Sequence, residues 1–323
     1  MTDTNLSLMA TLALKKLAAN KEYRDLFLAS DTLRDFLRPA ALRYIISEDR
    51  GEMLDKLAAL QGKGYRTGVE YVGEEATTVE EVSSATDEYL TLIDLMAQHS
   101  TLFEPPQLGF DLSNVGMIIS RDLAIENCSR ILKHAADKDV GVIISMERSQ
   151  WTDSILDIFL ELSGHYPNLG ITLQAQLNRT PDDLDAVLKT GCKVRLVKGV
   201  YAEPAQISLP RGVVLNERYL GLLDRISGAN IRYAFATQDP LLVSEIINSE
   251  IATGGELEML HGVRPELIKG VKDQGLIKTR VSAVYGTNWY LHLLHRIAEF
   301  PENIFLALDD TAAKRQSASA SKY

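Results

Sequence analysis

Short apolar runs alternate with longer amphipathic segments through most of the chain after Gly51. Runs with β-strand character are predicted at 68–72, 101–104, 140–145, 169–174, 193–197, 231–236, 257–260 and 279–284. Helical patterns are predicted over 78–96, 181–189, 216–226 and 288–299, and from Thr152, Pro240 and Pro265 onward. Eight such units in about 250 residues favour a (β/α)8 TIM barrel. A doubly wound open sheet is the alternative, but no Gly-rich phosphate turn of the GxGxxG type occurs.

The first fifty residues read as helical. Leu6, Met9 and Leu12 recur at helical spacing, and Asp31 marks a second helix start that we expect to be broken at Pro39. The end of the chain is rich in Ser, Ala and Lys. We therefore expect three parts: an N-terminal helical segment (1–50), a catalytic barrel (51–310) and a disordered tail (311–323).

Composition narrows the class of partner. Lys and Arg number 34 against 44 Asp and Glu, a formal net charge of -10, which argues against nucleic acid or anionic lipid as partner. Cys128 and Cys192 stand in no metal or redox spacing, so we interpret both as buried hydrophobes. No secretory signal and no apolar run of about 18 residues occurs, so we expect a cytoplasmic protein without a transmembrane segment. A homo-oligomer is compatible with this composition.

Polar residues gather where the predicted strands end, which is where barrel enzymes carry their active sites. The last predicted helix adds His292, His295, Arg296 and Glu299. The residues at the strand ends are Glu104, Ser145, Met146, Glu147, Gln174, Lys198, Tyr201, Thr237, Gln238 and His261.

Arg195 lies within a strand that reads as buried on both faces, and a buried guanidinium needs an anionic or electron-rich partner. One interpretation is a salt bridge to a carboxylate of a neighbouring strand, such as Glu147. The other is a contact to an electron-accepting cofactor. Lys198 and Gly199 at the end of the same strand would suit a phosphate, because a cation stands beside a residue that permits close backbone approach.

The run from Arg195 to Tyr201 resembles the RLVKGAY signature of the proline dehydrogenase family. Four other segments resemble further motifs of that family and occur in the same order: 107–112, 173–176, 256–262 and 285–299. The resemblance implies a distorted (β/α)8 barrel with preceding helices that binds FAD non-covalently. It also implies oxidation of L-proline to pyrroline-5-carboxylate by hydride transfer to the flavin, with a quinone or another electron acceptor reoxidising it.

Carried over position by position, the flavin side is largely kept. The resemblance places Arg195 by the reactive nitrogen of the flavin, favouring the anionic reduced ring. Gln238 and Glu258 replace a histidine and a glutamine of the family. The implied cofactor-binding residues are Met146, Gln174, Arg195, Lys198, Gly199, Tyr201, Thr237, Gln238 and Glu299.

The substrate side departs further. The family holds the proline carboxylate with a lysine and two arginines, and these positions carry Glu104, His295 and Arg296 here. The formal charge of the three falls from +3 to about 0 when His295 is neutral. Other implied substrate-binding positions that differ from the family are His292, Ser282 and Ser145.

Three explanations follow from these departures. The first is a flavoenzyme that oxidises a C–N bond of an amine or of a carboxyl-masked, proline-like substrate, with catalysis by Arg195 and with His295 or Glu104 taking the ammonium proton. The second is a metal-dependent or other non-flavin enzyme using His292, His295 and Glu104, since imidazoles and carboxylates suit iron, zinc or manganese. The third is a catalytically silent binding homologue. The first implies a small amine or imino acid substrate and no metal.

Overall fold

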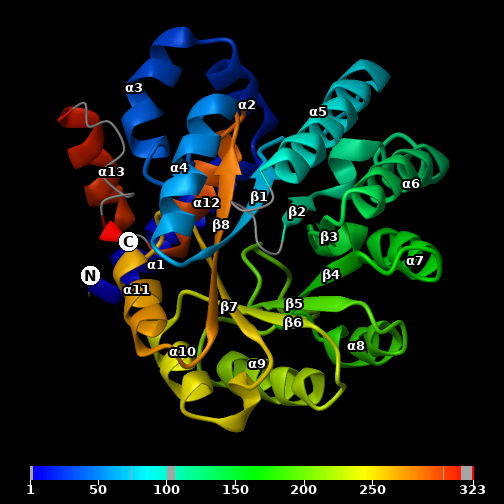
Figure 1. Ribbon diagram of the computed structural model, residues 1–323. Helices are drawn as coiled ribbons and strands as arrows, with labels where there is room; N and C mark the ends of the chain where they lie inside the picture. The colour runs from blue at the N-terminus through cyan, green and yellow to red at the C-terminus, as the bar shows by residue number, and fades with distance from the viewer. Residues whose placement is uncertain (1–2, 74, 100–105, 301, 314–321) are drawn as a thin grey trace.

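Eight parallel strands form a closed barrel in the computed structural model, which describes residues 3–73, 75–99, 106–300, 302–313 and 322–323 (Figure 1). β8 pairs back onto β1 from Arg66↔Arg280 to Tyr71↔Tyr285, and this pairing confirms the barrel over the open sheet. The strands are β1 (Arg66–Tyr71), β2 (Gln107–Phe110), β3 (Gly141–Ile144), β4 (Leu169–Gln174), β5 (Lys193–Val197), β6 (Tyr233–Ala236), β7 (Glu256–Leu260) and β8 (Lys278–Tyr285).

Helices connect successive strands and surround the barrel (Figure 1). The first of them begins at a capping box, in which Thr78 and Glu81 each satisfy a backbone N–H of the other residue. These helices are α5 (Val79–Gln98), α6 (Arg121–Asp137), α7 (Thr152–Ser163), α8 (Thr180–Leu188), α9 (Val213–Ser227), α10 (Pro240–Ile247), α11 (Pro265–Gln274) and α12 (Tyr290–Glu299).

The second strand is the one that the sequence misplaced. It is β2, whose four residues are all buried and which pairs with β1 and β3. The strand predicted at 101–104, and Glu104 with it, lies outside the described residues. β2 follows directly after Pro105-Pro106 in the sequence. It has only four residues, Gln-Leu-Gly-Phe, and this short mixed run shows no clear hydrophobic pattern that would predict a strand.

Four helices precede the barrel: α1 (Asp3–Ala19), α2 (Lys21–Leu28), α3 (Asp31–Ala41) and α4 (Arg50–Gly62). The predicted start at Asp31 is confirmed, with Ser30 as its N-cap. Pro39 lies inside α3 instead of ending it. The barrel pattern begins after α4 and not at Gly51, because α4 buries Met53, Leu57 and Leu60 at helical spacing.

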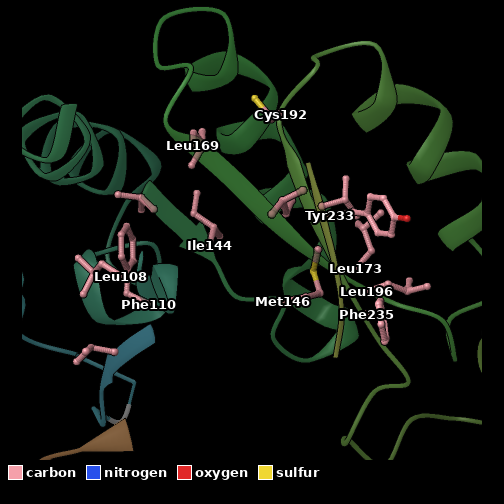
Figure 2. Packing of buried hydrophobic residues seen from close by; sticks show 14 of the residues in the cluster. Leu108, Phe110, Ile144, Met146, Leu169, Leu173, Cys192, Leu196, Tyr233 and Phe235 are labelled. Atoms are coloured by element: carbon pink, nitrogen blue, oxygen red, sulfur yellow. The ribbon is translucent and has the colours of Figure 1, made fainter. Parts of the chain in front are cut away.

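Two clusters of buried side chains hold these elements together. The larger one fills the space between the strands and their helices, and Figure 2 shows part of it, from Leu108 and Phe110 on β2 to Tyr233 and Phe235 on β6. The smaller one packs α12 against the N-terminal helices, where the Phe27 and Trp289 rings meet edge to face at 4.9 Å. The N-terminal helices therefore fix the helix that carries the two site histidines.

Part of the segment predicted as a disordered tail is described by the structure. α13 (Asn303–Ala312) includes residues 311–312 and packs on α3 and α12, whereas 314–321 lie outside the described residues. The Tyr323 side chain is buried, its hydroxyl accepts a hydrogen bond of 2.8 Å from the Gly262 N–H, and its ring stacks on His261. Cys128 and Cys192 are both buried and free, as predicted. None of the described helices combines the length and the apolar character that crossing a bilayer requires.

Candidate active site

A cavity of about 700 Å³ opens at the carboxyl ends of the strands, a size typical of cofactor and substrate sites. Its walls come from strand ends, from α12 and from the first residues of α9 and α10. It brings together all the described residues that the motif resemblance implies for catalysis, substrate binding or cofactor binding: Ser145, Met146, Gln174, Arg195, Lys198, Gly199, Tyr201, Thr237, Gln238, Ser282, His292, His295, Arg296 and Glu299. Glu147 and His261, which were also predicted at strand ends, do not line the cavity.

Arg195 is held by four side chains inside the barrel. Its Nη1 lies 2.7 Å from Glu70 Oε1 and 2.9 Å from Glu258 Oε1, and its Nε donates to the Thr172 hydroxyl at 2.9 Å. The predicted salt bridge therefore exists, but with different carboxylates from the one proposed. Glu147 instead accepts a hydrogen bond of 3.0 Å from the Ser113 N–H.

The fourth contact of Arg195 leads to a second carboxyl group. Its Nη2 donates to the Ser145 hydroxyl at 3.1 Å, and Ser145 in turn donates to Asp111, which follows β2. Burial and the nearby Glu70 raise the pKa of Asp111 to about 6. Burial, together with Asp111, raises the pKa of Glu147 to about 8. Glu70, Asp111 and Glu258 therefore line the cavity around Arg195 and form its acidic wall.

The two histidines of α12 are neutral at physiological pH. Burial, together with the Arg296 guanidinium, lowers the pKa of His292 to about 3 and that of His295 to about 3. The His295 ring meets the Tyr201 ring edge-on with centroids 5.6 Å apart. A neutral imidazole with such a low pKa is a poor acceptor for an ammonium proton. The buried position of His295 therefore does not favour it in that role.

Several polar atoms on the substrate side have no hydrogen-bond partner among the described residues. They are Ser282 Oγ, His292 Nε2 and Arg296 Nε, in side chains that line the same cavity. Arg296 does pair with Glu299, at 2.9 Å from Nη1 to Oε2. Buried polar atoms without partners are costly, and their gathering along one cavity marks a place where a ligand supplies the missing contacts.

The residues on the opposite wall can hold a phosphate-bearing cofactor. The N-termini of α9 and α10 both reach the cavity, which suits anionic groups. Gly199 adopts φ +107°, and a Cβ there would lie 2.4 Å from the Gln176 side chain, so the backbone needs glycine at this point. Lys198 lines the cavity and pairs with Asp239 at 2.5 Å. A cation, a close-approach glycine and two helix N-termini on one wall are chemically suited to the phosphates of a cofactor such as FAD.

The metal-binding alternative finds no support in the described ranges. His292 and His295 share one face of α12, but no group of three or more His, Cys, Asp or Glu residues among those described is arranged to hold a metal ion.

Sequence reasoning missed Glu70, Asp111, Arg211 and Arg264, all of which line the cavity. Glu70 stands near the end of β1, inside the strand predicted at 68–72, so the strand-end rule could have found it directly. Asp111 comes directly after β2, so the same rule would have found it had β2 been placed correctly. Arg264 has φ +49° and its guanidinium lies 4.6 Å from the centre of the Phe300 ring. No sequence pattern marks that contact.

The closed barrel and this polar cavity define a (β/α)8-barrel protein with a site for a cofactor and a small substrate. A family model described as proline dehydrogenase matches residues 53–208. Proline dehydrogenase 1 of Bacillus subtilis is 29% identical over 276 residues, which cover 84% of this chain and 90% of that protein. The proline dehydrogenase of Deinococcus radiodurans is 27% identical over 273 residues, covering 81% and 87%. The chain is thus similar to the proline dehydrogenase family over most of its length, and the resemblance found in its motifs is confirmed.

Solved structures agree on the fold. Proline utilization A of Bdellovibrio bacteriovorus, inactivated by N-propargylglycine, superposes with a TM-score of 0.72 at 16% identity, over 99% of this chain and 45% of that chain. A Bradyrhizobium japonicum proline utilization A variant gives 0.68 at 18% identity, over 87% and 31%. This chain thus spans less than half the length of either protein, and the similarity bears on the barrel alone.

Proposed function

We propose that this protein is an FAD-dependent oxidoreductase that oxidises the C–N bond of an amine, or of a proline-like substrate whose carboxyl group is masked, to an imine. The charge balance of the cavity carries this proposal. Arg195 is offset by two carboxylates, Arg296 is paired with Glu299, and both histidines are neutral. A free substrate carboxylate would lose charge-assisted hydrogen bonds of about 1.5–3 kcal/mol each at such a site.

The residues that would hold the cofactor are those of the wall described above. Lys198, Gly199 and the N-termini of α9 and α10 suit its phosphates, and Gln174 and Arg195 suit its ring. When bound, FAD accepts a hydride from the carbon next to the substrate nitrogen. The proline dehydrogenases of Bacillus and Deinococcus support this choice of reaction class.

The protein side chains have two tasks in this reaction. The Ser282, His292 and Arg296 atoms that lack partners among the described residues orient the substrate within the cavity. A carboxyl group of the acidic wall stabilises the cationic form of the amine on entry. The oxidation then needs the amine in its neutral form, so that the nitrogen lone pair can form the C=N bond as the hydride leaves.

Turnover with a dye acceptor tests the proposal, comparing L-proline methyl ester and pyrrolidine with L-proline on the purified yellow protein. We expect both carboxylate-free compounds to reduce the flavin at least about tenfold more efficiently than L-proline, the equivalent of about 1.4 kcal/mol. Efficient oxidation of free L-proline would refute the substrate class. A protein that binds no flavin, or a flavin that none of the three reduces, would refute the oxidoreductase assignment and favour a silent homologue.

A matched pair of lysine variants tests whether Lys198 contacts the phosphates of the cofactor. Lys198→Gln should lower flavin retention on gel filtration, because Lys198 lines the cavity. Lys189→Gln changes an exposed lysine just after α8 and should retain flavin as the parent protein does. Equal retention in both variants would argue against Lys198 as a phosphate contact.

A further inference from the structure

The acidic wall of the cavity includes one carboxyl group, that of Asp111, to which neither the family motifs nor the proposed cofactor contacts assign a role. Asp111 follows β2, lines the cavity and stands at the end of a hydrogen-bonded chain that runs from Arg195 through Ser145. The Ser145 hydroxyl has a single proton. Because it accepts from Arg195 Nη2, that proton is directed to the Asp111 carboxylate.

The same wall is rich in negative charge. Arg195 bonds to both Glu70 and Glu258, and Lys193 and Arg280 also stabilise the Glu258 carboxylate. Asp111 meets Arg195 only through the Ser145 hydroxyl among the described residues, so it is the least compensated carboxyl group of this wall. The charged groups that face Asp111 are Glu70 on β1, Glu75 after it, Glu147 after β3 and Arg195 on β5. A cationic ligand beside Asp111 would relieve this imbalance.

A second observation points to a ligand at this cavity. Ser282 and Arg296 are 2% and 8% exposed, and each has a polar atom without a partner among the described residues. His292 is held by a hydrogen bond to the backbone of Tyr44, which leaves its Nε2 as the unpartnered ring nitrogen. A neutral imidazole whose other nitrogen donates offers a lone pair at Nε2, an acceptor suited to an N–H group.

We propose that Asp111 is the group that binds the substrate as an ammonium ion and takes its proton. This inference rests on the proposed function and deepens it, because it selects a basic amine as substrate and replaces His295 as the proton acceptor. The N–H bond of the ammonium breaks and an O–H bond forms on the Asp111 carboxyl. The lone pair so released becomes available for the C=N bond, for which FAD would supply the hydride acceptor, and Asp111 then returns its proton to water.

The protonation state of Asp111 is suited to this exchange. Burial and Glu70 raise its pKa to about 6, so the carboxylate is the main form at pH 7.5 and holds a proton more firmly than an exposed aspartate would. The Arg195 guanidinium and, after it, the hydrogen bond from Ser145 lower the pKa of Asp111 and so oppose this rise.

Two variants of the flavin-loaded protein test the proposal. Asp111→Asn should weaken pyrrolidine binding at pH 7.5 by about tenfold or more in calorimetry, and slow flavin reduction in stopped-flow measurements by about 100-fold. Asp224→Asn, an exposed aspartate of α9, is the matched control and should leave both unchanged. Binding to the parent protein should weaken below about pH 6, and Asp111→Asn should lose this dependence.

Ser145→Ala provides a second test, which remains available if Asp111→Asn fails to fold. Its readout is the pH profile, which would not change if Asp111 had a purely structural role. Removing the hydrogen bond to the carboxylate should move the acid limb of the pH profile to higher pH. An Asp111→Asn protein with the parent's affinity and pH profile, or an unmoved limb in Ser145→Ala, would overturn the role of Asp111. Asp111-dependent pyrrolidine binding without flavin reduction would uphold the ammonium site and overturn the oxidoreductase proposal instead.

Discussion

The Nη1 atom of Arg195 lies 2.9 Å from the Oε1 atom of Glu258 inside the barrel, and the two side chains are 9% and 2% exposed. Glu258 stands where the motif resemblance implies a glutamine, so this chain holds a carboxylate against the guanidinium expected beside the flavin. A buried carboxylate there opposes the growth of negative charge in the cavity.

Glu258→Gln should therefore raise the midpoint potential of the bound flavin, because it removes a negative charge near the reduced ring. A shift on the order of 30 mV corresponds to about 1.4 kcal/mol for a two-electron couple. Redox titration measures it, with Glu217→Gln on the exposed face of α9 as the control. An unchanged or lower potential would contradict the placement of the flavin beside Arg195.

His295→Arg restores a cation at one of the positions implied to hold the proline carboxylate. We expect the affinity for L-proline to rise about tenfold or more, the worth of one charge-assisted hydrogen bond, while the affinity for the methyl ester stays constant. Calorimetric titration with both ligands checks this. His165→Arg, at an exposed histidine just beyond α7, should change neither affinity. An equal gain in affinity for the ester and the acid would show that residue 295 does not contact the substrate carboxylate.

The two neutral histidines make the stability of the fold depend on pH. Burial holds the pKa of each at about 3, well below the value of about 6.5 in an unfolded chain. The unfolded state therefore binds more protons between these values, so stability is full above pH 6.5 and is lost as the pH falls toward 3.

Replacing His292 and His295 together by glutamine should flatten that dependence. The slope of unfolding free energy against pH between 6 and 4 should fall by at most about 1.4 kcal/mol per pH unit for each histidine. Urea unfolding at several pH values measures the slope, and His165→Gln is the control at an exposed site. A slope equal to the parent's would mean that neither imidazole is buried in neutral form.

Gly262 allows the turn after β7 to pass close to the N-terminal segment. Its φ is +75°, and a Cβ there would lie 1.7 Å from the Arg43 carbonyl oxygen. Gly262→Ala should therefore destabilise the protein by more than about 3 kcal/mol. Gly270→Ala meets open space within α11 and should stabilise by about 0.5–1 kcal/mol. Thermal unfolding compares the two, and a tolerated Gly262→Ala would contradict the close approach.

Much of the barrel was predictable because its strands are buried on both faces. β4 (Leu169–Gln174) and β5 (Lys193–Val197) coincide with the predicted runs, since parallel strands covered by helices read as continuous apolar segments. β2 was missed because four residues after two prolines carry too little pattern. That one error also concealed Asp111.

By itself, the sequence determined the class of fold, the resemblance to a family and most of the side chains at the strand ends, because periodicity and motif spacing are local properties of the chain. Only the tertiary structure decided which charges meet. Arg195 pairs with Glu70 and Glu258, which stand 125 and 63 residues away along the chain, and no local pattern specifies such contacts. The protonation of His295 and Asp111 was decided the same way, since burial depends on every element that closes around the cavity.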